Sequence, residues 1–316
     1  MNESAKTMMV SRMMSRFDLH QKYPTACLHA VGLSADVSGT RLLSLSTIAD
    51  AKNQQSALGQ FSIGRVGQFS ISADSTAAWR QSRFVVLRPF VEGLNQQPGC
   101  FERVITLDIP GCGNKRDQDV VSLRLDDVVE ELNQDLRVLG VSQAVLLGNS
   151  IAGAILPRMV FAAPQLFSHL VFLACALPDE GQSILQMLSS TLHGESPDHV
   201  GWPLDPVHST RQAMAVAIFG QDLSPSILEW LLSEVRQDTT PLCVATESIS
   251  HEGYAGMIPA SYIITQHDNI LPVDWQRRFA QRAGAGEVIE KDTAHESFVS
   301  HPQLLAKVVR GFERHR

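Results

Sequence analysis

The sequence predicts an α/β fold in which helices flank a mostly parallel central sheet. Two patterns support this. Short apolar segments alternate with segments of helical period along most of the 316-residue chain, and one long stretch holds helix-like segments only. We therefore expect an N-terminal extension at residues 1–40 and a core at 41–178 and 257–316. A helical cap, inserted at 179–256, should interrupt this core.

The first part of the core should contribute strands and one helix. Residues 42–47 are predicted to form a strand. The unit Gly-Gln-Phe-Ser-Ile occurs at 59–63 and again at 67–71, and it alternates apolar and polar residues as strands do. A helix is expected over 79–97. The strand that follows, at 103–108, runs into the turn cluster Ile-Pro-Gly-Cys-Gly.

The middle of the chain combines a clear helix with a buried strand. Apolar residues recur at helical spacing over 126–139, and Gly140 ends the pattern. The next strand is predicted at 144–147. A second helix should run over 151–163, and Pro157 within it is expected to produce a kink.

Strands and helices continue to alternate towards the C-terminus. In an open parallel sheet of this kind, ligands bind outside the carboxyl ends of the strands, so the functional site is expected there. The remaining predicted elements are a strand at 170–174, cap helices at 184–192, 211–219 and 226–235, a strand at 261–265, a helix at 275–283, a strand at 287–290 and a closing helix at 302–312.

Ser150 lies where the predicted strand at 144–147 turns sharply into a helix. A serine between an apolar strand and a helix, with small residues around it, is typical of a nucleophile elbow. The turn strains the serine backbone, so large side chains at Gly148 and Ala152 would collide. Alanine is small enough for this second position, where glycine is common, and Gly153 follows it.

Two downstream residues complete a candidate catalytic triad with Ser150. A serine hydroxyl needs a base to take its proton, and the near-neutral pKa of histidine suits that task. His295 follows the last predicted strand and is the candidate base. Asp268 follows the strand at 261–265 and is the candidate carboxylate that orients the imidazole. The chain order Ser, Asp, His matches the order known for nucleophile-elbow enzymes.

Four other residues compete with these assignments. Asp179 ends the segment after the elbow and could be the acid in a variant geometry. His267 is adjacent to Asp268 and would point elsewhere. Asp292 is expected to be solvated, and His301, which precedes the closing helix, is expected at the surface or at a helix cap.

An oxyanion hole requires two backbone N–H groups that point at the developing negative oxygen. Ile151, directly after the serine, should provide one. The loop after an early strand should provide the other, through Ala73 or Asp74, although this loop lacks the His-Gly pair that is common there. A carboxylate at Asp74 would oppose the oxyanion unless it points away. An ordinary turn at 72–75 is the competing interpretation.

Several further residues have both a functional and a structural interpretation. Asn149 could anchor the elbow, but a plain turn residue is the simpler interpretation. Phe90 and Phe219 could line an acyl pocket, although aromatic residues in apolar segments are usually core. Trp202 is interpreted as packing within the core or the cap.

Composition excludes several classes of protein. Lys plus Arg number 26 and Asp plus Glu number 33, giving a net charge of −7, and no basic cluster suggests nucleic acid. No apolar run reaches the about 18 residues that a membrane span needs. The start of the chain lacks the apolar region of a secretory signal, and five widely spaced cysteines are typical of reduced thiols, so we expect a cytoplasmic protein. The oligomeric state stays open, a homodimer included.

Four stretches of the chain carry a recognisable pattern: Arg103–Gly113, Gly148–Gly153, Leu170–Gly181 and Ser261–Pro272, the last followed by Trp275–Ala280. The first three resemble the α/β-hydrolase superfamily, and the fourth resembles its plant-type methylesterase and hydroxynitrile-lyase branch. The resemblance covers about residues 65 to 314. It implies an α/β-hydrolase fold with a helical cap, Ser150 as nucleophile, Asp268 as acid, His295 as base, and no cofactor.

These features predict a serine hydrolase that cleaves a small apolar carboxylic ester through an acyl-enzyme. Its partner would be a small-molecule substrate. Two alternatives stay open: a C–C bond hydrolase or hydroxynitrile-lyase-like enzyme on the same residues, and a catalytically degenerate homologue that binds a ligand. The missing His-Gly pair motivates the second alternative.

Overall fold

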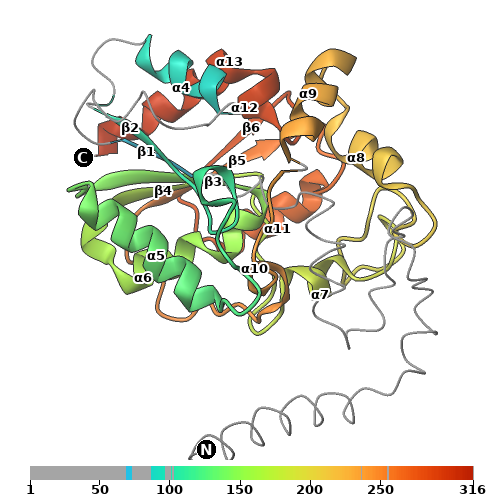
Figure 1. Cartoon of the computed structure of the whole chain (residues 1–316), viewed down its shortest axis with the longest axis horizontal. Helices are drawn as coiled ribbons and strands as arrows, with labels where there is room; N and C mark the ends of the chain where they lie inside the picture. Colours follow the sequence, from blue (N-terminus) through green and yellow to red (C-terminus); the bar gives the residue numbers. More distant parts are fainter. Residues whose placement is uncertain are drawn as a thin grey trace, which may run out of the picture.

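A six-stranded sheet runs through the middle of the computed structural model (Figure 1). The structure describes residues 69–72, 87–96, 101, 103–235, 237–254 and 256–315. The expected strands at 42–47 and 59–63 lie outside these residues, as does the expected extension at 1–40. In chain order the strands are β1 (Phe69–Ser72), β2 (Val104–Leu107), β3 (Ala144–Asn149), β4 (Phe167–Leu173), β5 (Ala260–Thr265) and β6 (Glu287–Lys291).

The sheet has a parallel part and an antiparallel part. Its spatial order is β2-β1-β3-β4-β5-β6. Strands β3 to β6 pair in parallel, whereas β1 is antiparallel to both β2 and β3. Every residue of β3 and β5 is buried, as expected for strands covered on both faces. Strand β6 closes one edge and carries exposed charged residues, which disfavour further pairing.

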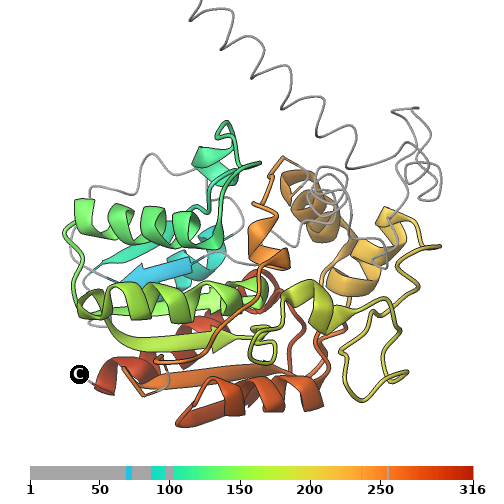
Figure 2. The same ribbon diagram turned by 90° about the horizontal axis from the view of Figure 1, so that it is seen from below.

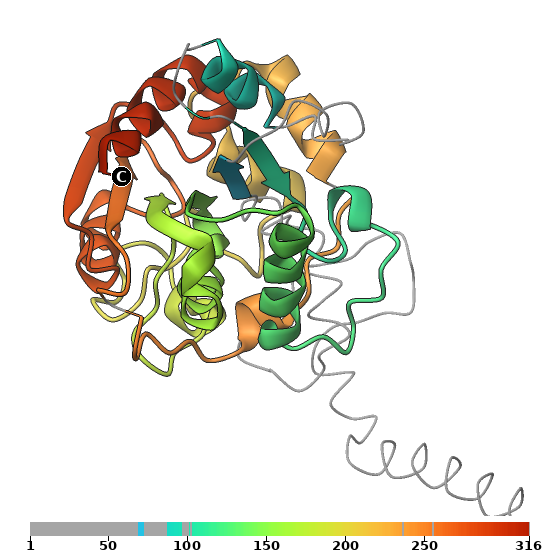
Figure 3. The same cartoon turned by 90° about the vertical axis from the view of Figure 1, so that its left-hand side faces the viewer.

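Helices cover both faces of this sheet (Figures 2 and 3). Helix α4 (Arg88–Asn95) packs against α13 (Pro302–Val309) on one face. Helix α5 (Leu125–Val138) packs against α6 (Leu156–Ala162) on the other. Helix α11 (Val273–Arg282) packs against β5. The predicted α/β architecture with a mostly parallel sheet is therefore confirmed.

Between β4 and β5 the described residues form helices and contribute no strand to the sheet. These helices gather at the end of the sheet where the parallel strands finish (Figures 1 and 2). They are α7 (Ile184–Leu188), α8 (Arg211–Phe219), α9 (Pro225–Val235) and α10 (Cys243–Thr246). The remaining helical segments are η3 (Gly113–Lys115), η4 (Ser150–Ala154), η5 (Pro164–Leu166), α12 (Ser297–Ser300) and η6 (Arg310–His315).

The helix predicted at 151–163 is wrong in its first turns. The chain instead forms the 3₁₀ turn η4 and then starts α6 at Leu156. Pro157 occupies the first turn of α6, where its missing N–H would have no partner in any case. The proline therefore marks the start of a helix and produces no kink within one.

Other boundaries shift for local reasons. Helix α7 ends at Leu188, because Ser189 adopts a left-handed backbone with φ of 60°. The closing helix α13 stops at Val309 and continues as η6. Helix α10 has only four residues, too few for a periodic pattern to predict it.

The composition led to expectations about membrane-spanning helices and about the cysteines. None of the helices in the described ranges is long and apolar enough to span a membrane. Three of the cysteines, Cys112, Cys175 and Cys243, are buried thiols that form no disulfide among the described residues.

Candidate active site

Ser150 stands directly after β3 in a strained backbone conformation. Its φ is 55°, in the left-handed region that a residue with a side chain rarely adopts. Its N–H donates to the Ala174 carbonyl oxygen at 3.1 Å, and its own carbonyl oxygen accepts from the Ala176 N–H at 2.9 Å. Strained residues of this kind concentrate at functional sites. These two hydrogen bonds to the chain after β4 hold the strained turn in place.

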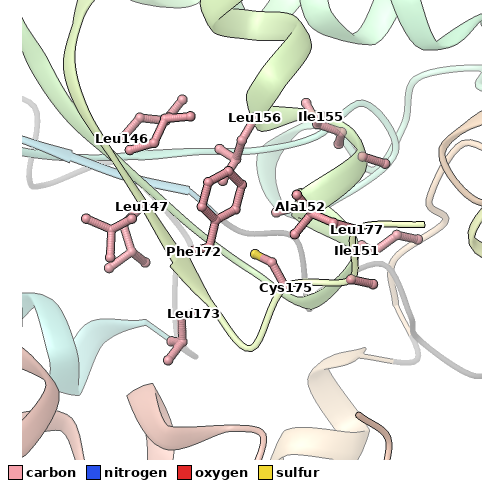
Figure 4. Packing of buried hydrophobic residues seen from close by; sticks show 14 of the residues in the cluster. Leu146, Leu147, Ile151, Ala152, Ile155, Leu156, Phe172, Leu173, Cys175 and Leu177 are labelled. Carbon is pink, nitrogen blue, oxygen red and sulfur yellow. The ribbon is translucent and has the colours of Figure 1, made fainter. Parts of the chain in front are cut away.

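The small residues around Ser150 have separate steric reasons. A Cβ at Gly148 would lie 2.7 Å from the Ala152 Cβ, and one at Gly153 would lie 2.1 Å from the Ala176 carbonyl oxygen. Figure 4 shows Ala152 among the buried side chains beside the elbow. After the serine, the position that tolerates no side chain is thus Gly153, one place later than the sequence pattern suggests, and the Ala152 methyl is accommodated.

His295 and Asp268 form a buried hydrogen-bonded pair. The distance from His295 Nδ1 to Asp268 Oδ2 is 2.6 Å, and the exposed fractions of the two side chains are 1% and 0%. Three further donors fix the carboxylate: the Thr265 hydroxyl at 2.9 Å, the Ile270 N–H at 2.9 Å and the Leu271 N–H at 2.8 Å. The Asp268 carboxylate therefore has one orientation, and it aligns the imidazole.

The other ring nitrogen of His295 is free. Nε2 is buried and has no hydrogen-bond partner among the described residues. Burial opposes a charge on this ring, but the charge and hydrogen bond of Asp268, with a contribution from Glu296, raise the pKa of His295 above its ordinary value. Ser150 and His295 line the same pocket.

The pocket beside Ser150 is almost entirely apolar. Trp202 is among its lining residues, and the indole N–H of Trp202 donates to the Ser189 carbonyl oxygen at 2.9 Å. The Phe219 ring centroid lies 6.3 Å from that of His295. The lining residues among those described are Ser150, Ile151, Ala176, Ile184, Met187, Leu188, Trp202, Ile218, Phe219, Ile270, Leu271 and His295.

The two aromatic candidates for the acyl pocket, Phe90 and Phe219, lie in different places. Phe219 lines the pocket, whereas Phe90 is fully buried in α4 and belongs to the hydrophobic core. Trp202 lines the pocket as well, a role that the sequence interpretation missed. Its only sequence signal is a tryptophan after Gly201, and Gly201 adopts a φ of 76° that favours glycine.

Asn149 anchors the elbow. Its side-chain Nδ2 donates to the Leu173 carbonyl oxygen at 3.0 Å and to the His295 carbonyl oxygen at 3.4 Å. The residue before the serine thus connects β3 to the end of β4 and to the loop that carries the histidine. The structure favours the anchoring role over that of a plain turn residue.

The competing titratable residues lie in other contacts. Asp179 forms an ion pair with Arg282 at 2.5 Å, and His267 pairs with Asp292. His301 Nδ1 lies 3.3 Å from Asp222 Oδ2. None of these residues is part of the described pocket lining.

The predicted oxyanion hole has one donor at Ile151 and a second in the loop at 73–74. Ile151 lines the pocket in the first turn of η4, where backbone N–H groups lack intrahelical partners. Ala73 and Asp74 lie outside the described residues. In the part of the chain that the structure describes, no group of His, Cys, Asp and Glu side chains could hold a metal ion.

Sequence comparisons identify a family and several relatives. A family model described as "Alpha/beta hydrolase family" matches residues 72–308. Methylesterase 2 of Arabidopsis thaliana is 26% identical over 241 residues, which cover 70% of this chain and 86% of the relative. Another Arabidopsis relative, described as a chloroplastic methylesterase, is 26% identical over 226 residues. That match covers 66% of this chain but only 56% of the relative's length.

Structural comparisons agree on the fold. A pyrethroid hydrolase matches with a TM-score of 0.59 at 20% identity, over 74% of this chain and 94% of that protein. A polyneuridine aldehyde esterase matches with a TM-score of 0.53 at 21% identity, over 72% of this chain and 94% of that one. At these identities the likeness is one of fold alone.

Proposed function

The chain belongs to the alpha/beta hydrolase family, and on that premise we propose that it is a serine hydrolase that cleaves a small apolar carboxylic ester. One observation carries the proposal: the free Nε2 of His295, whose other nitrogen is held by Asp268, lines the same apolar pocket as the strained Ser150. The relatives named methylesterases support an ester as the substrate.

In the proposed reaction Ser150 Oγ attacks the ester carbonyl carbon while His295 Nε2 takes the hydroxyl proton. The tetrahedral oxyanion accepts a hydrogen bond from the Ile151 N–H, and the residues that the sequence predicts as the second donor, at 73–74, lie outside the described residues. When the intermediate collapses, the alcohol leaves with the proton from Nε2. Water then attacks the acyl carbonyl carbon while His295 Nε2 takes a proton from it. When this second intermediate collapses, Nε2 returns the proton to the leaving Ser150 Oγ and the acid is released.

Asp268 acts on the histidine and not on the substrate. Its carboxylate accepts the Nδ1–H, so Nε2 is the unprotonated nitrogen of the neutral ring. When Nε2 gains the serine proton, the same carboxylate stabilises the imidazolium. Because both partners are shielded from water, the attraction between them is weakly screened.

Residues 179–256 serve, in this proposal, as a cap that shapes the substrate pocket. Half of the pocket lining comes from this segment, and no charged side chain is among the described lining residues apart from His295. Such a wall favours an apolar acyl or alcohol group and disfavours a free carboxylate or ammonium group, which would lose its hydration there. The contributing residues are Ile184, Met187, Leu188, Trp202, Ile218 and Phe219.

The test combines hydrolysis of short p-nitrophenyl esters with labelling by a fluorophosphonate. The parent protein should release nitrophenol and carry the label on Ser150, and Ser150→Ala should do neither. Ser168→Ala is a matched control, because that serine lies in β4 and donates to the Gln143 carbonyl oxygen, away from the pocket. Equal hydrolysis by Ser150→Ala and the parent would contradict the proposal.

A further inference from the structure

The loop that carries His295 is held through two of its backbone carbonyl groups, those of Thr293 and His295. The Thr293 carbonyl oxygen accepts from the His267 N–H at 3.0 Å, which connects it to the loop of Asp268. The His295 carbonyl oxygen accepts from Asn149 at 3.4 Å, which connects it to the elbow. Both contacts come from segments that carry the proposed catalytic residues themselves.

A third contact comes from outside these segments. The Ala294 N–H donates to Asp222 Oδ2 at 2.8 Å, and Asp222 lies in the connection between α8 and α9. The same oxygen accepts from the Ser300 hydroxyl at 2.8 Å and lies 3.3 Å from His301 Nδ1. The Asp222 carboxylate therefore contacts the chain on both sides of His295: at Ala294 before it, and at Ser300 and His301 after it.

The environment of Asp222 argues against a role in stability alone. Its side chain is only 16% exposed, and its second oxygen, Oδ1, is buried without a hydrogen-bond donor among the described residues. A buried carboxylate oxygen with no donor disfavours the folded state. Such a cost is typical of a residue whose position matters to function.

The segment that ends at Asp222 also reaches the loop of Asp268. The Ala217 carbonyl oxygen accepts from the Asn269 side chain at 3.1 Å, and Asn269 directly follows Asp268. Between these two contacts, Ile218 and Phe219 form part of the pocket wall. Residues 217–222 thus contact the loops of both Asp268 and His295 and also face the substrate.

We propose that residues 217–222, here called the bracket, set the relative position of Asp268 and His295, and that Asp222 is the positioning residue for His295. This inference rests on the proposed function. Asp222 acts through the Ala294 N–H: it fixes the backbone before His295, and with it the direction of Nε2 towards Ser150. Asp222 does not line the pocket, so its loss should change kcat more than KM.

The chain offers a closely matched control in Asp205. Its carboxylate also accepts two hydrogen bonds from nearby groups, the N–H of Val207 at 2.8 Å and of His208 at 3.1 Å. It also pairs with a histidine, His208, at 2.7 Å. These partners all lie within the same turn, far along the chain from His295. Asp205→Ala therefore removes the same kinds of contact without touching the proposed catalytic loops.

The experiment compares Asp222→Ala, Asp222→Asn and Asp205→Ala on a short p-nitrophenyl ester. Asp222→Ala should lower kcat by about tenfold or more, because small misplacements of catalytic groups have large effects on rate, while KM stays within about twofold. Asp222→Asn keeps an acceptor for the Ala294 N–H, so its kcat should recover to within about threefold of the parent. Asp205→Ala should match the parent.

Equal kcat values for Asp222→Ala and Asp205→Ala, both folded by near-UV circular dichroism, would overturn the bracket. If Asp222→Ala does not fold, Asn269→Ala replaces it, because it removes the bracket's other contact from a side chain near the surface. A fall in its kcat at unchanged Tm supports the bracket, and a parental kcat overturns it. Fluorophosphonate labelling of the parent is measured first: without a label on Ser150 the proposed function fails, whereas a labelled parent with an unaffected Asp222→Ala overturns the bracket only.

Discussion

The two sides of the pocket are built by different physical means. On the sheet side, hydrogen bonds hold the titratable pair: Asp268 has four donors, and the backbone around His295 is held at successive residues. On the opposite side, the residues of 184–219 contribute apolar surface. Hydrogen bonds are directional and fix geometry, whereas apolar contacts depend on shape and area.

In the proposed function, the polar side carries out the reaction and the apolar side selects the substrate. A change on the polar side should alter the rate for every substrate, because it changes the groups that react. A change on the apolar side should alter which substrate reacts, at a modest cost in rate, because it changes volume only. The predictions below test that separation.

The largest effect is expected from His295→Ala. Loss of the base should lower kcat on a p-nitrophenyl ester by about ten-thousandfold or more, whichever acyl group is used. His208→Ala is the control, since that histidine is exposed and pairs only within its own turn. If the loss of rate instead depended strongly on the acyl group, His295 would be a residue that selects the substrate and not the base.

Asp268→Asn should lower kcat by about a thousandfold to ten-thousandfold. An amide in place of the carboxylate disfavours the tautomer with a free Nε2 and removes the charge that stabilises the imidazolium. The matched variant is Asp179→Asn, the competing acid, whose carboxylate pairs with Arg282 and should leave kcat near the parental value. The reverse pattern would assign the acid to Asp179.

A change of the apolar wall should move selectivity. Met187→Ala enlarges the pocket, so kcat/KM for an ester with an acyl chain two carbons longer should rise by about tenfold relative to the short ester. Met214→Ala is the control, because Met214 is equally buried but does not line the pocket. Both variants should lower Tm through the cavity they leave. If Met187→Ala left the ratio of kcat/KM between the long and short esters unchanged, Met187 would not be a residue that limits the acyl chain.

The polar side could be predicted from sequence because each residue follows a recognisable strand. Ser150, Asp268 and His295 come after β3, β5 and β6, and parallel strands bring their carboxyl ends to one edge. The small residues Gly148 and Gly153 also indicate the strained backbone at Ser150 in the sequence.

The apolar residues of the pocket follow no comparable pattern in the sequence. Trp202 joins the pocket through an isolated bridge to Leu192, a contact between irregular segments that no period reveals. Asp222 contacts Ala294, which is 72 residues away, and a lone aspartate in a connection gives no sign of such a partner. The antiparallel placement of β1 between β2 and β3 was also beyond pattern reasoning, because sheet order depends on long-range pairing.

The pH dependence of the rate is the smallest effect and the most specific test of the polar side. Burial opposes protonation of His295, but Asp268, with Glu296, raises its pKa above the ordinary 6.5. The base must be neutral to act, so activity should fall as pH drops through this raised pKa. The acid limb of kcat/KM against pH should therefore lie above pH 6.5 in the parent.

The residual activity of Asp268→Asn should show that limb at lower pH, because burial still opposes the charged ring while the carboxylate that favours it is gone. Stability should follow the same sign. A raised pKa in the folded protein means that charged His295 contributes stability below the unfolded value of about 6.5, and this contribution is lost as pH rises through the folded pKa. Thermal unfolding of the parent and of His295→Ala across that range measures the contribution. Coincident acid limbs in the parent and in Asp268→Asn would mean that Asp268 aligns the imidazole without controlling its charge.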